Sequence, residues 1–346
     1  MQINSKYRLY FNGLLLAFLG GFLAHFIGIP LPWMLGPLIA VGIATATNCN
    51  ISIPEAPRPI CRALLGCAIG ANFSPEVLNR SLEIGLSLII LPIFILTMIF
   101  LTTIYLKKVM KFDYKTSIFG SIPGGLNEMV ILGNEVGVSP RTMVLIHSTR
   151  IVVVVFFASI ALYFLPNELK NISLEIDLFK NADQLLAVIF VSFFGYYIGK
   201  IIRLPGYTIT GPMIFSGVLH VLGLVKAMPI YFLIIIVQIV LGSVLGAQFK
   251  NISSKDIYGP IMSGFITTLI AFIPLSIFII ILIKFDYSLL SVILSYSPGG
   301  QSEMNILALS VGADMAFIST HHMLRVFMVI FLAAFIQKFL KWFNVD

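Results

Sequence analysis

Hydrophobic runs long enough to cross a membrane recur along the whole chain and are separated by short polar segments. The longest of these runs cover residues 82–106, 143–165, 185–202, 230–246, 257–283 and 315–335. A helix needs about 20 apolar residues to cross a hydrocarbon core of about 30 Å. Because lipid offers no hydrogen bonds to the backbone, we expect these runs to be helices. The pattern predicts about ten to twelve transmembrane or re-entrant segments.

The composition fits this pattern and excludes a soluble domain. Hydrophobic residues make up 58% of the chain and charged residues only 11%, with a mean hydropathy of +1.00, whereas charged residues are about 25% of soluble proteins. The net charge of +7 is spread over short loops, which is typical of the positive-inside rule and not of a nucleic-acid-binding surface. We therefore predict an all-α, multi-pass protein of the bacterial inner (cytoplasmic) membrane, with the lipid bilayer as a partner and no nucleic acid.

The chain carries an internal duplication. Ser-Ile-Pro-Gly-Gly-Leu-Asn-Glu-Met at 121–129 returns as Tyr-Ser-Pro-Gly-Gly-Gln-Ser-Glu-Met at 296–304, a shift of 175 residues. Other blocks match at shifts of 175, 176 and 173, namely 29–37 with 204–212, 65–73 with 241–249, and 111–114 with 284–287. Such self-similarity predicts two homologous membrane repeats. We place the first repeat at 1–166, a polar inter-repeat linker at 167–183, and the second repeat at 184–346.

Each repeat is expected to contain five apolar segments and one broken element at its Pro-Gly-Gly. Proline lacks a backbone donor, and glycine costs about 1 kcal/mol relative to alanine in a helix interior, so the segment should break there. A broken element that turns back gives five crossings per repeat and inverted repeats, whereas one that crosses gives six crossings and parallel repeats. The break favours inverted repeats, and the parallel arrangement stays open.

Polar groups cluster around both breaks, and we expect them to form a substrate- or ion-binding site at the interface of the two repeats. Paired broken segments are typical of transporter sites, and the freed N–H groups at a half-helix start attract anions. A nearby carboxylate could carry a coupling proton or sodium ion, although glutamate as a helix cap is the plainer alternative. The candidates are Gly124, Gly125, Asn127, Glu128, Gly299, Gly300, Gln301, Ser302, Glu303 and Asn305.

Two basic pairs follow the breaks at equal spacing. His147 and Arg150 lie three residues apart, as do His322 and Arg325, so each pair shares one face of an apolar helix. An arginine within a membrane span costs about 2.5 to 3.5 kcal/mol, so it should face the protein interior and have a partner. The glutamates after the breaks are candidate partners. In the functional interpretation the arginines hold a substrate anion, while a histidine or glutamate titrates; in the alternative, an ion pair locks two helices.

The two copies differ at positions that suggest different roles. Leu126 stands opposite Gln301, and Ser139 stands opposite Asp314. A further imidazole, His321, occurs in the second repeat alone. Neither the five histidines nor the three cysteines have the spacing of a metal-binding set. We therefore predict no metal, no cofactor, no catalytic residue and no enzyme; the alternative of a metal-dependent membrane oxygenase would require bound copper or iron.

The motifs resemble those of a known family. Leu-Pro-Trp-Met-Leu-Gly-Pro at 31–37, the two Pro-Gly-Gly-x-x-Glu-Met motifs and the His-x-x-Arg after each are similar to the bacterial AbrB-type membrane proteins with an internal duplication, over residues 13–342. Members carry labels such as putative ammonia monooxygenase or regulator of gene expression. The resemblance thus implies a membrane fold but supplies no catalytic residues.

These observations lead to two expectations of function. The first is a secondary transporter for a small anionic metabolite, coupled to protons or sodium, since duplicated repeats with broken segments and intramembrane ionisable groups are typical of transporters. The second is a membrane-embedded sensor or regulator of gene expression that binds a small ligand without moving it. Either one is compatible with a homo-oligomer.

Overall fold

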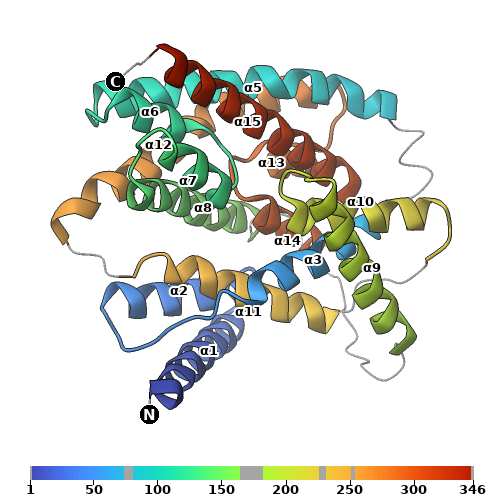
Figure 1. Ribbon diagram of the computed structural model, residues 1–346. Coiled ribbons are helices and arrows are strands. Elements are labelled where there is room, and N and C mark those ends of the chain that lie inside the picture. The colour runs from blue at the N-terminus through green and yellow to red at the C-terminus, as the bar shows by residue number, and fades with distance from the viewer. Residues whose placement is uncertain (1, 74–80, 164–181, 226–230, 251–253, 344–346) are drawn as a thin grey trace. The chain divides into compact units, whose positions relative to one another are not determined.

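All regular structure in the described part of the chain is helical (Figure 1). The computed structural model describes residues 2–73, 81–163, 182–225, 231–250 and 254–343. The first half contributes α1 (Gln2–Ile27), α2 (Pro32–Ala46), α3 (Pro57–Gly70), α5 (Ser81–Lys108), α6 (Tyr114–Ser121), α7 (Leu126–Asn134) and α8 (Pro140–Tyr163). The second contributes α9 (Ala182–Ile201), α10 (Tyr207–Val221), α11 (Tyr231–Ala247), α12 (Ser254–Ile283), α13 (Leu289–Tyr296), α14 (Gln301–Ser310) and α15 (Met315–Phe343).

Six of these helices are long and apolar enough to cross a membrane. Their candidate spans are Lys6–Ile27, Ile84–Lys108, Pro140–Ala161, Gln184–Ile201, Tyr258–Ile283 and Met315–Leu340. Three come from each half of the sequence. Large apolar side chains on them are exposed, for example Phe26 at 83% and Phe331 at 70%, as expected of surfaces that face lipid. The prediction of an all-α polytopic membrane protein is confirmed.

The backbone preserves the internal duplication closely. Among the described residues, ten have a left-handed backbone with positive φ. They form five pairs, each separated by 175 residues: Gly28 with Arg203, Leu31 with Gly206, Asn48 with Gly223, Lys111 with Asp286, and Gly137 with Gly312. The geometry thus pairs Lys111 with Asp286, so the structural shift of that block is 175 and not the 173 of the sequence match. The left-handed backbone conformation of these turns is the same in both halves even where the residue type differs.

The chain forms two compact units, and each unit takes equivalent helices from both halves of the sequence. Unit 1 comprises Met1–Leu78, Ser159–Ile252 and Leu309–Ala316, and therefore contains α1 to α3 and α9 to α11. Unit 2 comprises Asn79–Ala158, Ser253–Ala308 and Phe317–Asp346, and holds nearly all of α5 to α8 and α12 to α15. The compact units therefore do not coincide with the sequence repeats. The predicted linker, 167–183, lies almost wholly outside the described residues.

Unit 1 is joined by reciprocal glycine contacts between the halves. A Cβ at Gly66 of α3 would lie closer than 3.0 Å to the carbonyl oxygen of Ile209 in α10. A Cβ at Gly242 of α11 would clash equally with the carbonyl oxygen of Met34 in α2. Helices α2 and α11 lie side by side, as do α3 and α10. Small residues of this kind let membrane helices approach closely enough for direct backbone contact.

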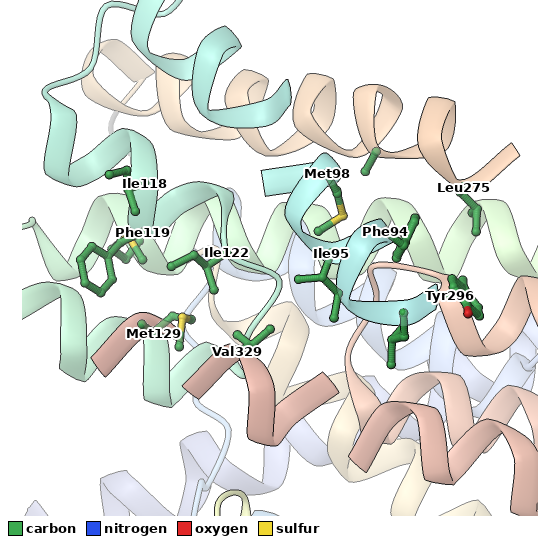
Figure 2. Close-up of a cluster of buried hydrophobic side chains, with 14 of the residues drawn as sticks. Phe94, Ile95, Met98, Ile118, Phe119, Ile122, Met129, Leu275, Tyr296 and Val329 are labelled. Atoms are coloured by element: carbon green, nitrogen blue, oxygen red, sulfur yellow. The ribbon is translucent and has the colours of Figure 1, made fainter. Parts of the chain in front are cut away.

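Unit 2 has an extensive apolar core that both halves share. Its buried side chains come from α5 to α8, α12, α13 and α15. Figure 2 shows part of this core, including Phe94 of α5, Phe119 of α6 and Tyr296 of α13. The rings of Phe94 and Tyr296 meet edge to face at a centroid distance of 5.2 Å. This core includes side chains of α6, α7 and α13, three of the short helices next to the Pro-Gly-Gly motifs.

Candidate functional site

Each Pro-Gly-Gly motif separates two short helices, as predicted. In the first copy α6 ends at Ser121 and α7 begins at Leu126; in the second, α13 ends at Tyr296 and α14 begins at Gln301. Ile122 and Ser297, which follow the first helix of each pair, have ψ near 124° and 132°, so the backbone leaves the helix there. The proline that comes next has no N–H to continue the ladder. Both interruptions lie in unit 2.

The His-x-x-Arg motif satisfies the carbonyl groups that the first break leaves free. His147 Nε2 lies 3.2 Å from the carbonyl oxygen of Phe119, and Arg150 Nη1 donates to the carbonyl oxygen of Ile122 at 3.2 Å. The last carbonyls of a helix have no partner within the helix and carry a partial negative charge of roughly half an electron. A buried cation at this end therefore meets both the hydrogen-bonding and the electrostatic need. We conclude that this motif caps the C-terminal end of α6.

The second copy repeats this arrangement and strengthens it. His322 Nε2 lies 3.0 Å from the carbonyl oxygen of Leu294, and Arg325 Nη1 donates to the carbonyl oxygen of Ser297 at 2.5 Å. Arg325 also donates through Nη2 to the carbonyl oxygen of Gly299, at 2.7 Å. Arg150 has no such second bond among the described residues. In the second break the arginine thus bonds to carbonyl groups before and after the proline, whereas in the first break it bonds only to the carbonyl group before the proline.

The expected pairing of the arginines with the glutamates is not what the structure contains. Within the described residues, the hydrogen bonds of Arg150 and Arg325 go to backbone carbonyls, and neither arginine forms an ion pair with a carboxylate. Both side chains are buried, with 4% and 2% of their surface exposed. They also lie near enough for their like charges to repel each other. The half-helix ends compensate only part of this positive charge.

The glutamates lie at the start of the second helix in each break. An added Cβ at Gly125 or Gly300 would clash with a carboxylate oxygen of Glu128 or Glu303, respectively. Each carboxylate therefore folds back over the residue that precedes the helix, which is the position of the glutamate in a capping box. Both glutamates are half-buried. The geometry agrees with the capping alternative.

Burial distinguishes the polar residues of the two copies. Asn127 after the first break is exposed, whereas Gln301, Ser302 and Asn305 after the second are buried. Several buried polar atoms of this region have no hydrogen-bond partner: Arg150 Nε, Arg325 Nε, His147 Nδ1, His322 Nδ1, Gln301 Nε2 and Asn305 Oδ1. Buried polar groups are normally satisfied, so such a concentration is a reason to expect a ligand, an ion or water.

The predicted site residues therefore come together, but within a single unit. Gly124, Gly125, Asn127, Glu128, His147 and Arg150 belong to unit 2, and so do their counterparts Gly299, Gly300, Gln301, Ser302, Glu303, Asn305, His322 and Arg325. The two copies meet closely, because a Cβ at Gly299 would lie 3.0 Å from Val154 Cγ1 of α8. The expectation of a site between two separate repeats is thus refined, since unit 2 is itself built from both.

A buried polar cluster in unit 2 contains residues that the motifs did not reveal. His321 Nε2 lies 2.8 Å from Ser87 Oγ, and the hydroxyl of Tyr296 donates to the carbonyl oxygen of Ser87 at 2.5 Å. The Nδ1 atom of His321 lies 2.7 Å from the carbonyl oxygen of Phe317. All three polar side chains are fully buried. The signal in the sequence was the extra imidazole, because Ser87 lies outside the duplicated motifs and Tyr296 opens the second motif opposite Ser121, a residue of a different kind.

The start of the first broken element is held by an aspartate. The carboxylate of Asp113 accepts a hydrogen bond from the backbone N–H of Thr116 at 2.9 Å and so caps α6. Burial raises the pKa of Asp113, but the hydrogen bonds from Thr116, the backbone N–H of Asp113 itself and the charge of Lys107 together lower it by more, and the pKa ends below its usual value. At the equivalent position before α13 stands Ser288, which makes no capping bond through its side chain.

Metal binding has no evident basis in the described residues. No group of three His, Cys, Asp or Glu side chains there is arranged to hold a metal ion. Cys61 and Cys67 are buried, Cys49 is exposed, and all three are free thiols. The absence of a metal and of a cofactor remains a prediction.

Fold and site define an internally duplicated membrane protein with paired broken helices, and comparison with known proteins adds its family. The family model described as transition state regulatory protein AbrB matches residues 12–341. The chain therefore belongs to the AbrB family, as the motifs indicated.

Two relatives show how far the similarity extends. The chain is 25% identical over 337 residues to "Uncharacterized protein YhjN" of Bacillus subtilis (strain 168), which covers 90% of this chain and 88% of the relative. It is 24% identical over 335 residues to "Putative regulator AbrB" of Escherichia coli (strain K12), and this match covers 93% of this chain and 92% of the relative. No solved structure matches the chain.

Proposed function

We propose that the protein is a secondary transporter of the bacterial inner membrane for a small anionic metabolite, coupled to protons or sodium. The observation that carries this proposal is the pair of broken helices, one from each half of the sequence, gathered in unit 2 with their ends capped by buried arginines. Irregular backbone at membrane depth is tolerated where it is buried in protein or lines a polar cavity. In transporters, such breaks provide the substrate and ion sites.

The residues divide naturally between the two ligands of this proposal. The free N–H groups at the starts of α7 and α14, together with the partly compensated arginines, favour an anion. The half-buried carboxylates of Glu128 and Glu303 favour a proton or a sodium ion. Because the whole site belongs to unit 2, exposure to the two sides of the membrane would alternate through displacement of that unit as a body.

The decisive experiment is flux into liposomes reconstituted with the purified protein. We expect uptake of labelled small carboxylates or sulfonates that depends on a proton or sodium gradient. Glu128→Gln and Glu303→Gln should fold but lose the gradient dependence, because the ion would have lost its carboxylate. An absence of flux over a broad set of anionic metabolites would contradict transport.

A membrane-embedded regulator of gene expression is the second candidate, favoured by the names of the family model and of the Escherichia coli relative. It would bind the same ligand and signal through a protein partner. Recovery of a stoichiometric signalling partner, together with no flux, would favour this candidate. In both proposals the partners are the bilayer, a small molecule or ion, and in a homo-oligomer a second copy of this chain, with no role for nucleic acid.

The proposal includes inverted repeats, since one break per half turns the chain back within the membrane. Reporter tags near Asn171 and after Trp342 should then lie on opposite sides of the membrane. Labelling of both tags from the same side would instead establish parallel repeats.

A further inference from the structure

The two breaks provide a control for each other, because they share a backbone but differ in two buried side chains. Gln301 and Asn305 lie one helical turn apart on the same face of α14. The equivalent positions of α7, at a shift of 175, are Leu126 and Val130. The first copy thus forms the same broken element with apolar side chains. The fold of a break does not require the polar pair.

The polar pair is also incompletely satisfied. Gln301 is 7% exposed and Asn305 fully buried. Asn305 Nδ2 donates to the carbonyl oxygen of Gln301 at 2.7 Å, which leaves Asn305 Oδ1 as an acceptor without a donor. Gln301 Nε2 is a buried donor without an acceptor. Leaving such groups unmet is unfavourable, so their presence in one copy alone indicates that something else satisfies them.

The surroundings specify the charge of the missing partner. Gln301 is the first residue of α14, where the backbone N–H groups carry a partial positive charge and the carboxylate of Glu303 folds back over Gly300. Two residues earlier, Gly299 accepts a hydrogen bond from Arg325, whose Nε is a further buried donor without a partner. A carboxylate is the group that suits this end of the helix. The ligand that satisfies these groups should therefore carry an anionic group at the start of α14 and a polar group next to Gln301 and Asn305.

The pair also specifies the polar group. Because Gln301 and Asn305 share one face of α14, a single hydroxyl between them would accept from Gln301 and donate to Asn305. An ammonium group has donors only and would leave Gln301 unmet, while a methyl group would leave both unmet. We propose that Gln301 and Asn305 select a small hydroxycarboxylate, with its carboxylate at the start of α14 beside Arg325. This inference rests on the proposed function for the site but not on transport itself.

The test compares acids that differ by one hydroxyl, with the full-length protein in detergent. Dissociation constants for lactate and propionate, and for malate and succinate, are obtained from ligand-dependent shifts of the thermal unfolding temperature. We expect each hydroxy acid to bind at least about tenfold more tightly than its deoxy partner, which corresponds to about one net hydrogen bond. Equal affinities within both pairs, or no shift with any of the four acids, would overturn the proposal.

The matched variant gives α14 the residues of α7. The double variant Gln301→Leu/Asn305→Val should fold, unfold at the same or a higher temperature without ligand, and bind lactate and propionate equally. Gln238→Leu removes another buried amide, in α11 of unit 1, and should leave the discrimination intact. Discrimination that survives in the double variant, or failure of that variant to fold, would refute the assignment.

Flux separates this inference from the proposed function. Hydroxyl-dependent binding without any flux in liposomes would support the hydroxycarboxylate site and contradict the transporter. Carboxylate flux with no preference for the hydroxyl would leave the transporter in place and overturn the role of Gln301 and Asn305.

Discussion

Units 1 and 2 solve the same problem, the association of two homologous sets of helices, in different ways. In unit 1 the halves meet through glycines, and Gly66 and Gly242 bring backbone against backbone. In unit 2 the halves share a large apolar core, and two of the helical elements are broken and capped by buried cations. Continuous helices satisfy their own backbone groups, whereas broken ones must obtain donors from other helices.

This difference indicates where chemistry can reside. Unit 1 joins its halves through glycine contacts between helices, which suits a structural role. Unit 2 concentrates free helix ends, glutamates and arginines within one compact body. Substitutions in the two units should therefore destabilise the protein for different reasons. The two breaks within unit 2 should also differ in how much stability they lose when their arginine is replaced.

The largest effect is expected from removal of the arginine caps. Arg325→Met loses two charge-assisted hydrogen bonds to the break, so the free energy of unfolding should fall by about 3 kcal/mol after allowing for relief of the buried charge. Arg150→Met loses one and should cost about half as much. Unfolding by denaturant in mixed micelles measures both. An equal loss for the two variants would contradict the unequal support of the breaks.

The next effect concerns the glycine contacts of unit 1. Gly66→Leu and Gly242→Leu should each lower the free energy of unfolding by about 1 to 3 kcal/mol, because the new side chain meets a backbone carbonyl that has little room to move. Gly85→Ala is the control, since nothing lies within 4 Å of its Cβ position in α5, and alanine should stabilise that helix by up to about 1 kcal/mol. Comparable losses at all three positions would show that close contact is not the cause.

A smaller effect is expected at the starts of α7 and α14. Glu128→Gln and Glu303→Gln each remove a negative charge from a helix N-terminus, where it contributes about 0.3 to 1 kcal/mol. The thermal unfolding temperature should therefore fall only slightly, while ion-dependent flux is lost. A large loss of stability in either variant would assign that glutamate a purely structural role.

The smallest effect is a dependence on pH that belongs to the first copy alone. The pKa of Asp113 is lowered in the folded protein, so its cap contributes fully above the unfolded value of about 4 and is lost as the pH falls through the folded value. Between neutral pH and pH 3, the wild-type protein should lose slightly more stability than Asp113→Asn. Thermal unfolding at both pH values tests this, and identical losses would refute it.

Much of the fold could be predicted from the sequence because membrane helices and tandem repeats leave strong local signals. Apolar length identifies the spanning helices, and Pro-Gly-Gly identifies the breaks. The division into two units was not predictable in this way. It depends on which glycine faces which carbonyl, such as Gly66 against Ile209, and such contacts have no periodic pattern.

The burial of the basic pairs could be predicted from the sequence, but their contacts could not. The spacing of His147 and Arg150 correctly placed them on one buried face, but charge alone suggested carboxylate partners. The actual acceptors are backbone carbonyls at the ends of α6 and α13, which the side-chain sequence does not display. Ser87 and Tyr296 were missed for a similar reason, since their association with His321 depends on packing between distant helices.

The construction of each unit from both halves also has a consequence for biosynthesis. Helices α2 and α3 are synthesised early, but their glycine-contacting partners, α11 and α10, begin at Tyr231 and Tyr207. At a synthesis rate of about 5 to 20 residues per second, α2 and α3 are made on the order of ten seconds before the helices that they contact. During that interval the nascent chain exposes surfaces complementary to those of other nascent chains. Neither unit can be completed by the first half alone, so correct assembly depends on the second half arriving on the same chain.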